Sequence, residues 1–111
     1  MQSWRLIISP PSDGFTNMAV DEALFKAVSA GTSLPTLRFY TWEPPAVSVG
    51  YFQNSLREVD LSVCREMGID VVRRLTGGRA VLHDRELTYS IISPDNSFNF
   101  PDNILGTYKI I

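Results

Sequence analysis

Residues 72–90 read VRRLTGGRAVLHDRELTYS, and this stretch predicts more of the fold than any other. The β-branched and aromatic residues around the glycine pair favour strands over 69–74, 80–83 and 87–92, with Thr76-Gly77-Gly78 as a turn. Charged and titratable side chains crowd the same stretch: Arg73, Arg74, Arg79, His83, Asp84, Arg85 and Glu86. Polar groups concentrated at strand ends are typical of a functional site.

The glycine pair has two interpretations. In the functional one, Gly77 and Gly78 allow positive φ and leave backbone N–H groups unshielded, so that they hold an anion or a carbonyl oxygen. The flanking arginines would then suit a carboxylate, a phosphate or an acyl-adenylate. In the structural one, the glycines serve a hairpin turn and the arginines are solvated. The residues alone leave both interpretations open.

Several common sites are not supported. The stretch lacks the lysine and hydroxyl of a Walker P-loop and the spacing of the GxGxxG dinucleotide fingerprint. No metal site is expected, because one histidine and one cysteine without clustered carboxylates cannot complete a tetrahedral shell. A Cys64–His83 hydrolase dyad is disfavoured, since Cys64 lies on an expected apolar helix face and is better explained as a small buried hydrophobe. For His83 we expect a role in polar lining or in orienting a carbonyl.

Upstream of this stretch, periodicity predicts the other elements. Strands are expected over 4–8, 36–40 and 46–49, and a tight hairpin loop at 42–45 would join the last two. A helix capped by Thr16 or Asn17 would hold Asp21 and Glu22 near its positive start and end at Gly31. Its apolar positions would be Val20, Leu24, Ala27 and Val28, and a shorter helix capped by Asp60 and closed by Gly68 would carry Val63, Cys64 and Met67. Six strands and two helices predict an α+β fold with helices on one face of a sheet.

Composition limits the function classes. The chain has 111 residues and a net charge of -2, so we expect at most one domain, spanning 1–111 or continuing beyond it, and no duplex nucleic-acid binding. A single cysteine favours a reducing compartment, the cytoplasm by default. The first residues contain no run that would form a signal peptide or a membrane anchor. Residues 102–111 resemble the opening of a helix with an apolar ending, which suggests truncation.

The string RRLTGGRAVLHD, residues 73–84, closely resembles the RRxTGGGAVxHD signature of lipoate-protein ligases and the related octanoyltransferases. The segments NMAVDEAL at 17–24, PTLRFYTWEPPAVSVGYFQ at 35–53 and ELTYSI at 86–91 resemble family segments in the same order, so the resemblance covers nearly the whole chain. It implies the biotin/lipoate protein ligase fold, a mixed sheet flanked by helices and related to class II aminoacyl-tRNA synthetase domains.

The resemblance also implies a binding site. In ligases of the family, the arginine and the hydroxyl of this loop meet the acyl-adenylate and the glycines cover the acyl tail. The motif closes with a histidine and an aspartate, and a tryptophan and the acidic part of the first helix border the acyl pocket. The matching or neighbouring positions, taken as candidate substrate-binding residues, are Glu22, Trp42, Arg73, Arg74, Thr76, Gly77, Gly78, Arg79, Ala80, His83 and Asp84.

Arg79 stands where the ligase pattern often has a third glycine, which resembles the octanoyltransferases more closely. The resemblance therefore implies transfer of octanoyl from acyl carrier protein to a lysine of a lipoyl-carrier protein, the glycine cleavage H protein or a lipoyl domain, without a cofactor. The alternative is a lipoate ligase that uses ATP and Mg²⁺ to form lipoyl-adenylate. A further alternative is a non-catalytic acyl-binding fragment that needs a carboxy-terminal part. In both enzymes the reactive cysteine or lysine would lie downstream of Ile111, so the fragment alone is expected to be inactive.

Overall fold

The computed structural model describes residues 3–94, which form two small mixed sheets and three helices. The first sheet has the order β1-β2-β6, from β1 (Arg5–Ile8), β2 (Thr36–Tyr40) and β6 (Thr88–Ile92). The second has the order β4-β3-β5, from β3 (Ala46–Val49), β4 (Asp70–Arg73) and β5 (Val81–His83). The helices are α1 (Gly14–Ser29), α2 (Ser55–Glu58) and α3 (Leu61–Glu66). The expected α+β class, with mixed sheets flanked by helices, is confirmed.

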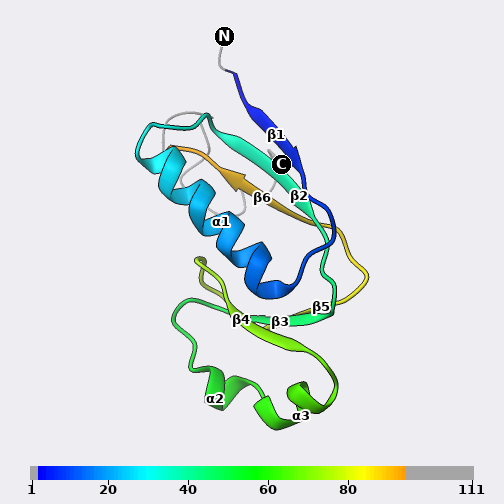
Figure 1. Ribbon diagram of the computed structural model, residues 1–111. Coiled ribbons are helices and arrows are strands. Elements are labelled where there is room, and N and C mark those ends of the chain that lie inside the picture. Colours follow the sequence, from blue (N-terminus) through cyan, green and yellow to red (C-terminus); the bar gives the residue numbers. More distant parts are fainter. Residues whose placement is uncertain (1–2, 95–111) are drawn as a thin grey trace.

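The two sheets have the same construction. β1 and β2 are parallel and connected by α1, while β3 and β4 are parallel and connected by α2 and α3. We call each such pair of parallel strands with its connecting helices a unit. Each unit has one further, antiparallel strand: β6 pairs with β2 and β5 pairs with β3. Parallel neighbours need such a crossover, because a tight turn can only reverse the chain direction. Helix α1 runs beside the first sheet and its amino-terminal end reaches the second, whereas α2 and α3 lie on the far side of the second sheet (Figure 1).

The hairpin expected between the second and third strands is wrong, since β2 and β3 belong to different sheets. The reason lies in the backbone of their connection. Thr41 O accepts from Ser12 N at 3.5 Å and Glu43 N donates to Ser12 O at 2.9 Å, so the segment pairs with the chain before α1. The next two residues, Pro44 and Pro45, have no N–H with which to close a hairpin ladder.

The start of α1 is also earlier than expected. Asp13 is the cap, because its carboxylate accepts from Thr16 N and Thr16 Oγ1, both at 2.8 Å. Asp21 and Glu22 therefore lie in the middle of α1, and the prediction that they mark its positive end is wrong. The end of α1 agrees with the sequence, since Gly31 adopts a φ of 76° just after the last turn.

The shorter elements are close to expectation. Asp60 caps α3 by accepting from Val63 N at 3.1 Å, and Gly68 closes it with a φ of 71°. Cys64 is the buried residue of α3, as a structural thiol should be. Helix α2 was not anticipated, because four residues are too few for a recognisable period. The expected helix over 102–111 lies outside the described residues.

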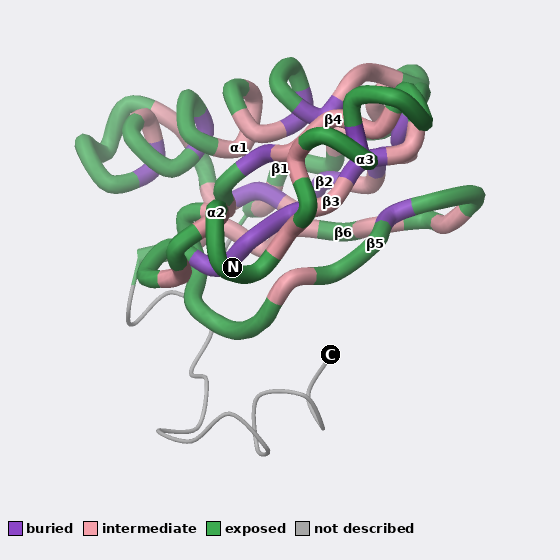
Figure 2. Tube along the Cα trace, turned by 90° about the horizontal axis from the view of Figure 1, so that it is seen from below, coloured by how far each residue is buried: buried purple, intermediate pink, exposed green. Residues whose placement is uncertain are grey.

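The core joins α1 to the second sheet. Tyr40, Trp42, Ala46 and Val72 form the buried cluster, and Met18 of α1 packs against it. Gly14 permits this contact, because a Cβ at that position would lie 3.0 Å from Val72 and 3.1 Å from Ala46. Buried positions concentrate in β2, β3 and the inner side of α1, whereas α2 and most loops are exposed (Figure 2). Among residues 3–94, none of the helices has the length and apolar content that a bilayer crossing requires.

Candidate acyl-binding site

A cavity of about 1020 Å³ lies between α1, β6 and the segment that follows β4. This volume is at the upper end of the range for small-molecule sites, which are usually apolar with a few polar groups. This cavity, also called the groove below, has apolar residues from α1 on one side and from the strands on the other: Phe15, Met18, Phe25, Tyr40, Trp42, Tyr89 and Ile91. The charged lining residues are Asp21, Glu22, Arg73 and Arg74, and His83 also lines the cavity.

Arg73 is the last residue of β4 and braces the loop after β3. Its Nη1 donates to three backbone carbonyls at 3.1, 2.9 and 2.7 Å, those of Gly50, Tyr51 and Gln53. Because Nη1 carries two N–H groups, at least one of them is shared between two of these carbonyls. The loop that borders the cavity through Tyr51 is thus held by Arg73.

Arg74 binds the glycine turn in the same manner. Its Nη2 donates to the carbonyl oxygens of Gly77 and Arg79 at 2.9 and 2.8 Å. Its Nη1 donates to Ser48 O at 3.0 Å and to Ser48 Oγ at 2.6 Å. Burial lowers the pKa of Arg74 from its ordinary value, but an arginine in a protein keeps its proton at neutral pH.

The carbonyl contacts determine where the turn's N–H groups point. The C=O and N–H of one trans peptide point in opposite directions, so a carbonyl held by Arg74 directs the following amide away from it. The amides of Gly78 and Ala80 therefore point away from Arg74. Thr76 O accepts from Tyr51 N at 2.9 Å, so the Gly77 amide points away from Tyr51 by the same geometry. No backbone N–H from Leu75 to Arg79 donates to another described residue. Such a run of free amides is a preorganised site for an anion or a carbonyl oxygen.

The turn also depends on glycine at two positions. Gly78 has a φ of 98°, which side chains other than glycine rarely adopt. Gly50 lies directly against the turn, since a Cβ there would overlap the carbonyl oxygen of Gly78. The loop after β3 and the glycine turn are therefore packed backbone to backbone.

His83, at the end of β5, is buried between two hydrogen-bond partners. Its Nε2 lies 2.7 Å from Ser48 Oγ and its Nδ1 lies 2.8 Å from Glu86 Oε1. The ring stacks on Trp42 with centroids 4.2 Å apart, and the indole N–H donates to Thr88 Oγ1 at 2.8 Å. Because both ring nitrogens are occupied, a Cys64–His83 dyad does not form. No cluster of metal-binding side chains occurs among residues 3–94.

A second polar cluster lies at the side of the cavity, around Asp21. The carboxylate accepts from Arg38 Nη1 at 2.8 Å, from Tyr40 Oη at 3.2 Å and from Ser90 Oγ at 2.8 Å. Burial raises the pKa of Tyr40 to about 12, so the phenol keeps its proton at neutral pH. Glu22, the acid chosen from the sequence, also lines the cavity, but it is exposed and pairs with Lys26 at 3.4 Å rather than joining this cluster.

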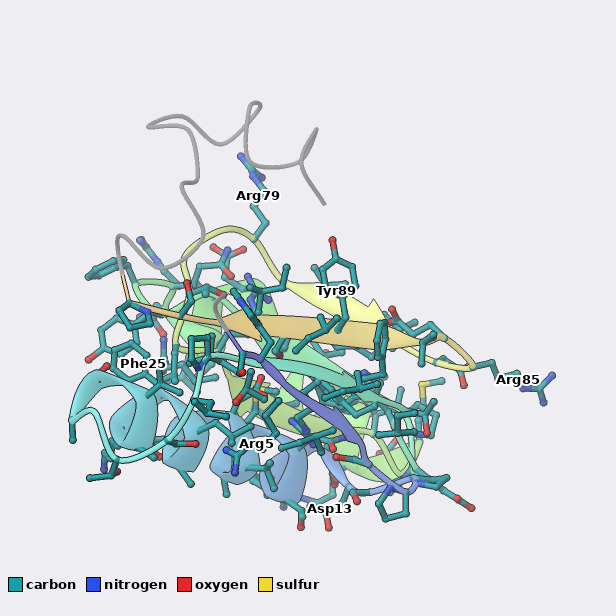
Figure 3. The ribbon with its side chains drawn as sticks, turned by 90° about the horizontal axis from the view of Figure 1, so that it is seen from above. Arg5, Asp13, Phe25, Arg79, Arg85 and Tyr89 are labelled. Carbon is teal, nitrogen blue, oxygen red and sulfur yellow. The ribbon has the colours of Figure 1, made fainter. Side chains whose placement is uncertain are left out.

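The structure brings most of the candidate residues together. Six line the cavity: Glu22, Trp42, Arg73, Arg74, Thr76 and His83. The backbones of Gly77, Gly78 and Arg79 join them through Arg74 and Gly50. Ala80 is half-buried beside them, and Asp84 is exposed after β5 and does not line the cavity. The side chains of Arg79 and Arg85 extend away from the body of the protein (Figure 3).

Three members of this site were not among the candidates. Arg38, Ser48 and Glu86 each hold a functional or lining group in place. Arg38 and Ser48 lie inside strands, where the sequence gives no sign of a polar contact. Glu86 follows His83 by three residues, and this short spacing could have indicated that the two side chains are in contact.

Several known proteins are similar to this chain. The chain is 52% identical to the octanoyltransferase LipM of Clostridioides difficile over 111 residues, which is 100% of this chain and 41% of the relative. A putative lipoate protein ligase from T. acidophilum with bound lipoic acid superposes with a TM-score of 0.73 at 36% identity, covering 89% of this chain and 41% of that one. A lipoate-protein ligase A bound with ATP gives 0.65 at 37% identity, covering 86% and 39%.

This chain thus spans about two fifths of the length of each of these proteins. The family model of the lipoyl protein ligase A/B catalytic domain matches residues 13–111, which include α1, the strands from β2 to β6 and the glycine turn. The expected family is confirmed: the chain belongs to the lipoyl protein ligase A/B catalytic domain family.

Proposed function

We propose that the full-length protein transfers an octanoyl group from acyl carrier protein to a lysine of a lipoyl-carrier protein, the glycine cleavage H protein or a lipoyl domain. The observation that carries the proposal is the cavity of about 1020 Å³, apolar along α1 and β6, beside a turn whose amides from Leu75 to Arg79 donate to no other residue of the described part of the chain. An acyl chain needs an apolar channel, and its reacting carbonyl needs hydrogen-bond donors at one end. The similarity to an octanoyltransferase over the whole chain supports the same choice.

In this proposal the chain binds and polarises, while the covalent step uses a residue outside it. The N–H groups of the glycine turn stabilise the negative charge that develops on the carbonyl oxygen when the thioester is attacked. Cys64 is buried in α3 and does not line the groove, so it is not the acyl acceptor. A cysteine elsewhere in the full-length protein would accept the acyl group and pass it to the lysine amine. A single free cysteine within this chain also fits the cytoplasm proposed for the reaction.

The second candidate is lipoate ligation through lipoyl-adenylate, with ATP and Mg²⁺. The likeness to a lipoate-protein ligase A bound with ATP favours it. In that case the free amides of the turn and the exposed guanidinium of Arg79 would face phosphate rather than a thioester carbonyl.

One assay separates the two. The full-length protein is incubated with apo H protein and either octanoyl-acyl carrier protein without nucleotide, or lipoate with ATP and Mg²⁺, and the H protein is weighed by mass spectrometry. We expect a mass increase of one octanoyl group in the first mixture. Modification only in the second mixture would replace the transferase by the ligase.

A protein that binds octanoyl-acyl carrier protein but modifies H protein in neither mixture would support the non-catalytic alternative instead. Residues 1–111 expressed alone serve as the control, and they are expected to transfer nothing.

A further inference from the structure

Four side chains form a continuous chain of hydrogen bonds behind the glycine turn. Arg74 Nη1 reaches Ser48 Oγ at 2.6 Å, Ser48 Oγ reaches His83 Nε2 at 2.7 Å, and His83 Nδ1 reaches Glu86 Oε1 at 2.8 Å. The chain runs from the residue that holds the turn carbonyls to a carboxylate in the segment before β6. We call these four residues the relay.

Ser48, His83 and Glu86 are hydrogen-bonded in the order of a hydrolase triad, but a substrate cannot reach the serine. Ser48 is 0% exposed, so no substrate carbonyl reaches its oxygen. That oxygen also accepts from a guanidinium, which withdraws electron density from a would-be nucleophile. The arrangement therefore does not support covalent catalysis by Ser48.

Arg74 can only donate, so Ser48 Oγ accepts from it. With the neutral imidazole protonated on Nδ1, every contact of the relay is satisfied: Ser48 Oγ donates to His83 Nε2, and His83 Nδ1 donates to the Glu86 carboxylate. The stacked Trp42 ring, at an interplanar angle of 11°, fixes the plane of the imidazole. Each member is thus oriented by the next.

We propose that Ser48, His83 and Glu86 are positioning residues that hold Arg74, and through it the carbonyls of the glycine turn, so that the turn's amides face the acyl carbonyl. This assignment gives Ser48 and Glu86 a role in acyl transfer without contact to substrate. It rests on the proposed function only for the last step, since the orientation of the turn is a property of the protein without ligand.

The test compares Glu86→Gln in two backgrounds, the natural one and Ser48→Ala. Glu86→Gln keeps the size of the side chain but removes its charge, and Glu86 is only half-buried, so the variant should fold. Ser48→Ala removes the hydroxyl that connects His83 to Arg74 by hydrogen bonds. The matched control is Arg85→Asn, which changes the exposed neighbour of Glu86 and suits its φ of 53°.

The first measurement needs no substrate. In the full-length protein, the backbone amide NMR signals of Gly77 and Gly78 should shift with Glu86→Gln, and this shift should disappear in the Ser48→Ala background. Arg85→Asn should leave both signals in place. Unchanged glycine signals in Glu86→Gln, or equal shifts in both backgrounds, would overturn the relay. If Ser48→Ala does not fold, Glu86→Gln alone still tests the relay, because unchanged signals of Gly77 and Gly78 in that variant would contradict it.

The second measurement is octanoyl transfer. Glu86→Gln should lower kcat by about fivefold with little change in KM for the acyl donor, and should have no further effect in Ser48→Ala, because coupled sites are not additive. A loss of thermal stability without a change in kcat, or equal losses in both backgrounds, would contradict a positioning role. If the glycine signals respond but the natural protein transfers no octanoyl group, the relay stands and the proposed function fails.

Discussion

At the scale of single residues, three arginines of this chain are engaged in holding other parts of the protein. Arg38 is 1% exposed and binds Asn17, Asp21 and Ser9. Arg73 binds backbone carbonyls of the loop after β3, and Arg74 binds backbone carbonyls of the glycine turn. A pair of arginines beside a glycine turn therefore does not by itself identify an anion site. In this chain Arg74 orients the amides of the turn, and no N–H from Leu75 to Arg79 donates to another residue within 3–94.

Asp21 should be a strong determinant of stability. Asp21→Ala removes the carboxylate partner of buried Arg38 and leaves an uncompensated charge, which costs about 3–5 kcal/mol when a buried pair is broken. The measurement is the free energy of unfolding by urea denaturation of the full-length protein.

The neighbouring Glu22→Ala is the matched control. Its ion pair with Lys26 is solvent-exposed on the same helix and contributes about 0.3–0.5 kcal/mol. Equal destabilisation by the two variants would contradict the assignment of Asp21 to the buried network.

Gly50 should be intolerant of any side chain. The new Cβ in Gly50→Ala would overlap Gly78 O, so the glycine turn must move, at a cost of about 1–3 kcal/mol for overpacking. Gly77→Ala tests the same turn from the open side, where a Cβ meets nothing within 4 Å, and its melting temperature should stay close to that of the natural protein. If Gly50→Ala melted at the same temperature as the natural protein, the close contact between Gly50 and the carbonyl of Gly78 would be contradicted.

At the scale of elements, local patterns predicted what local forces control. The segments of β2 and β3 were predicted to the residue, and Asp60 and Gly68 were recognised as the ends of α3, because these depend on side-chain alternation and capping. The expected hairpin between β2 and β3 was wrong, because the course of the chain there depends on contacts of Ser12 with Thr41 and Glu43, which are distant in sequence. Asn17 was mistaken for a cap for a similar reason: it is fully buried and its carboxamide binds Arg38.

The site divides in the same way. The glycine turn and its arginines were found because they form one motif that resembles a family signature. Ser48 was not found, and Glu86 was noted only among the charged residues of the motif, because their roles arise only when β3 pairs with β5 and places Ser48 beside His83. A buried serine inside a strand carries no signal of its own.

The cap of α1 makes a prediction that depends on pH. Hydrogen bonds from the backbone and side chain of Thr16 hold the pKa of Asp13 below its usual 3.8. A carboxylate with a lowered folded pKa stabilises the protein above its unfolded pKa, and that stability is lost as the pH falls through the folded value. Asp13→Ala should therefore lower the melting temperature at neutral pH, and the difference from the natural protein should shrink as the pH falls below 3.8.

Asp84→Ala is the comparison for this prediction. Asp84 is an exposed carboxylate outside any helix, and its removal should leave the melting temperature unchanged at both ends of the pH range. A gap between Asp13→Ala and the natural protein that persists undiminished at low pH would contradict the capping role.

At the scale of the whole molecule, the groove lies where the two similar units meet. Helix α1 and β6 belong to the first unit, while the glycine turn follows β4 of the second. The acyl chain would then contact one unit and its reacting carbonyl the other. That residues 1–111 form part of one larger domain stays a prediction, and the exposed Leu6 and Ile8 on the edge strand β1 fit it.

The most direct test of this account is to locate the acyl chain. Acyl carrier protein is loaded with an octanoyl group that bears a photoreactive diazirine at its far end, the full-length protein is irradiated with it, and the labelled peptides are identified by mass spectrometry. We predict labels on α1 and β6, within residues 15–28 and 89–93, and their loss when unlabelled octanoyl-acyl carrier protein is in excess. Labels confined to α2 and α3, or labels that the natural donor does not displace, would contradict the central claim that this groove holds the acyl group.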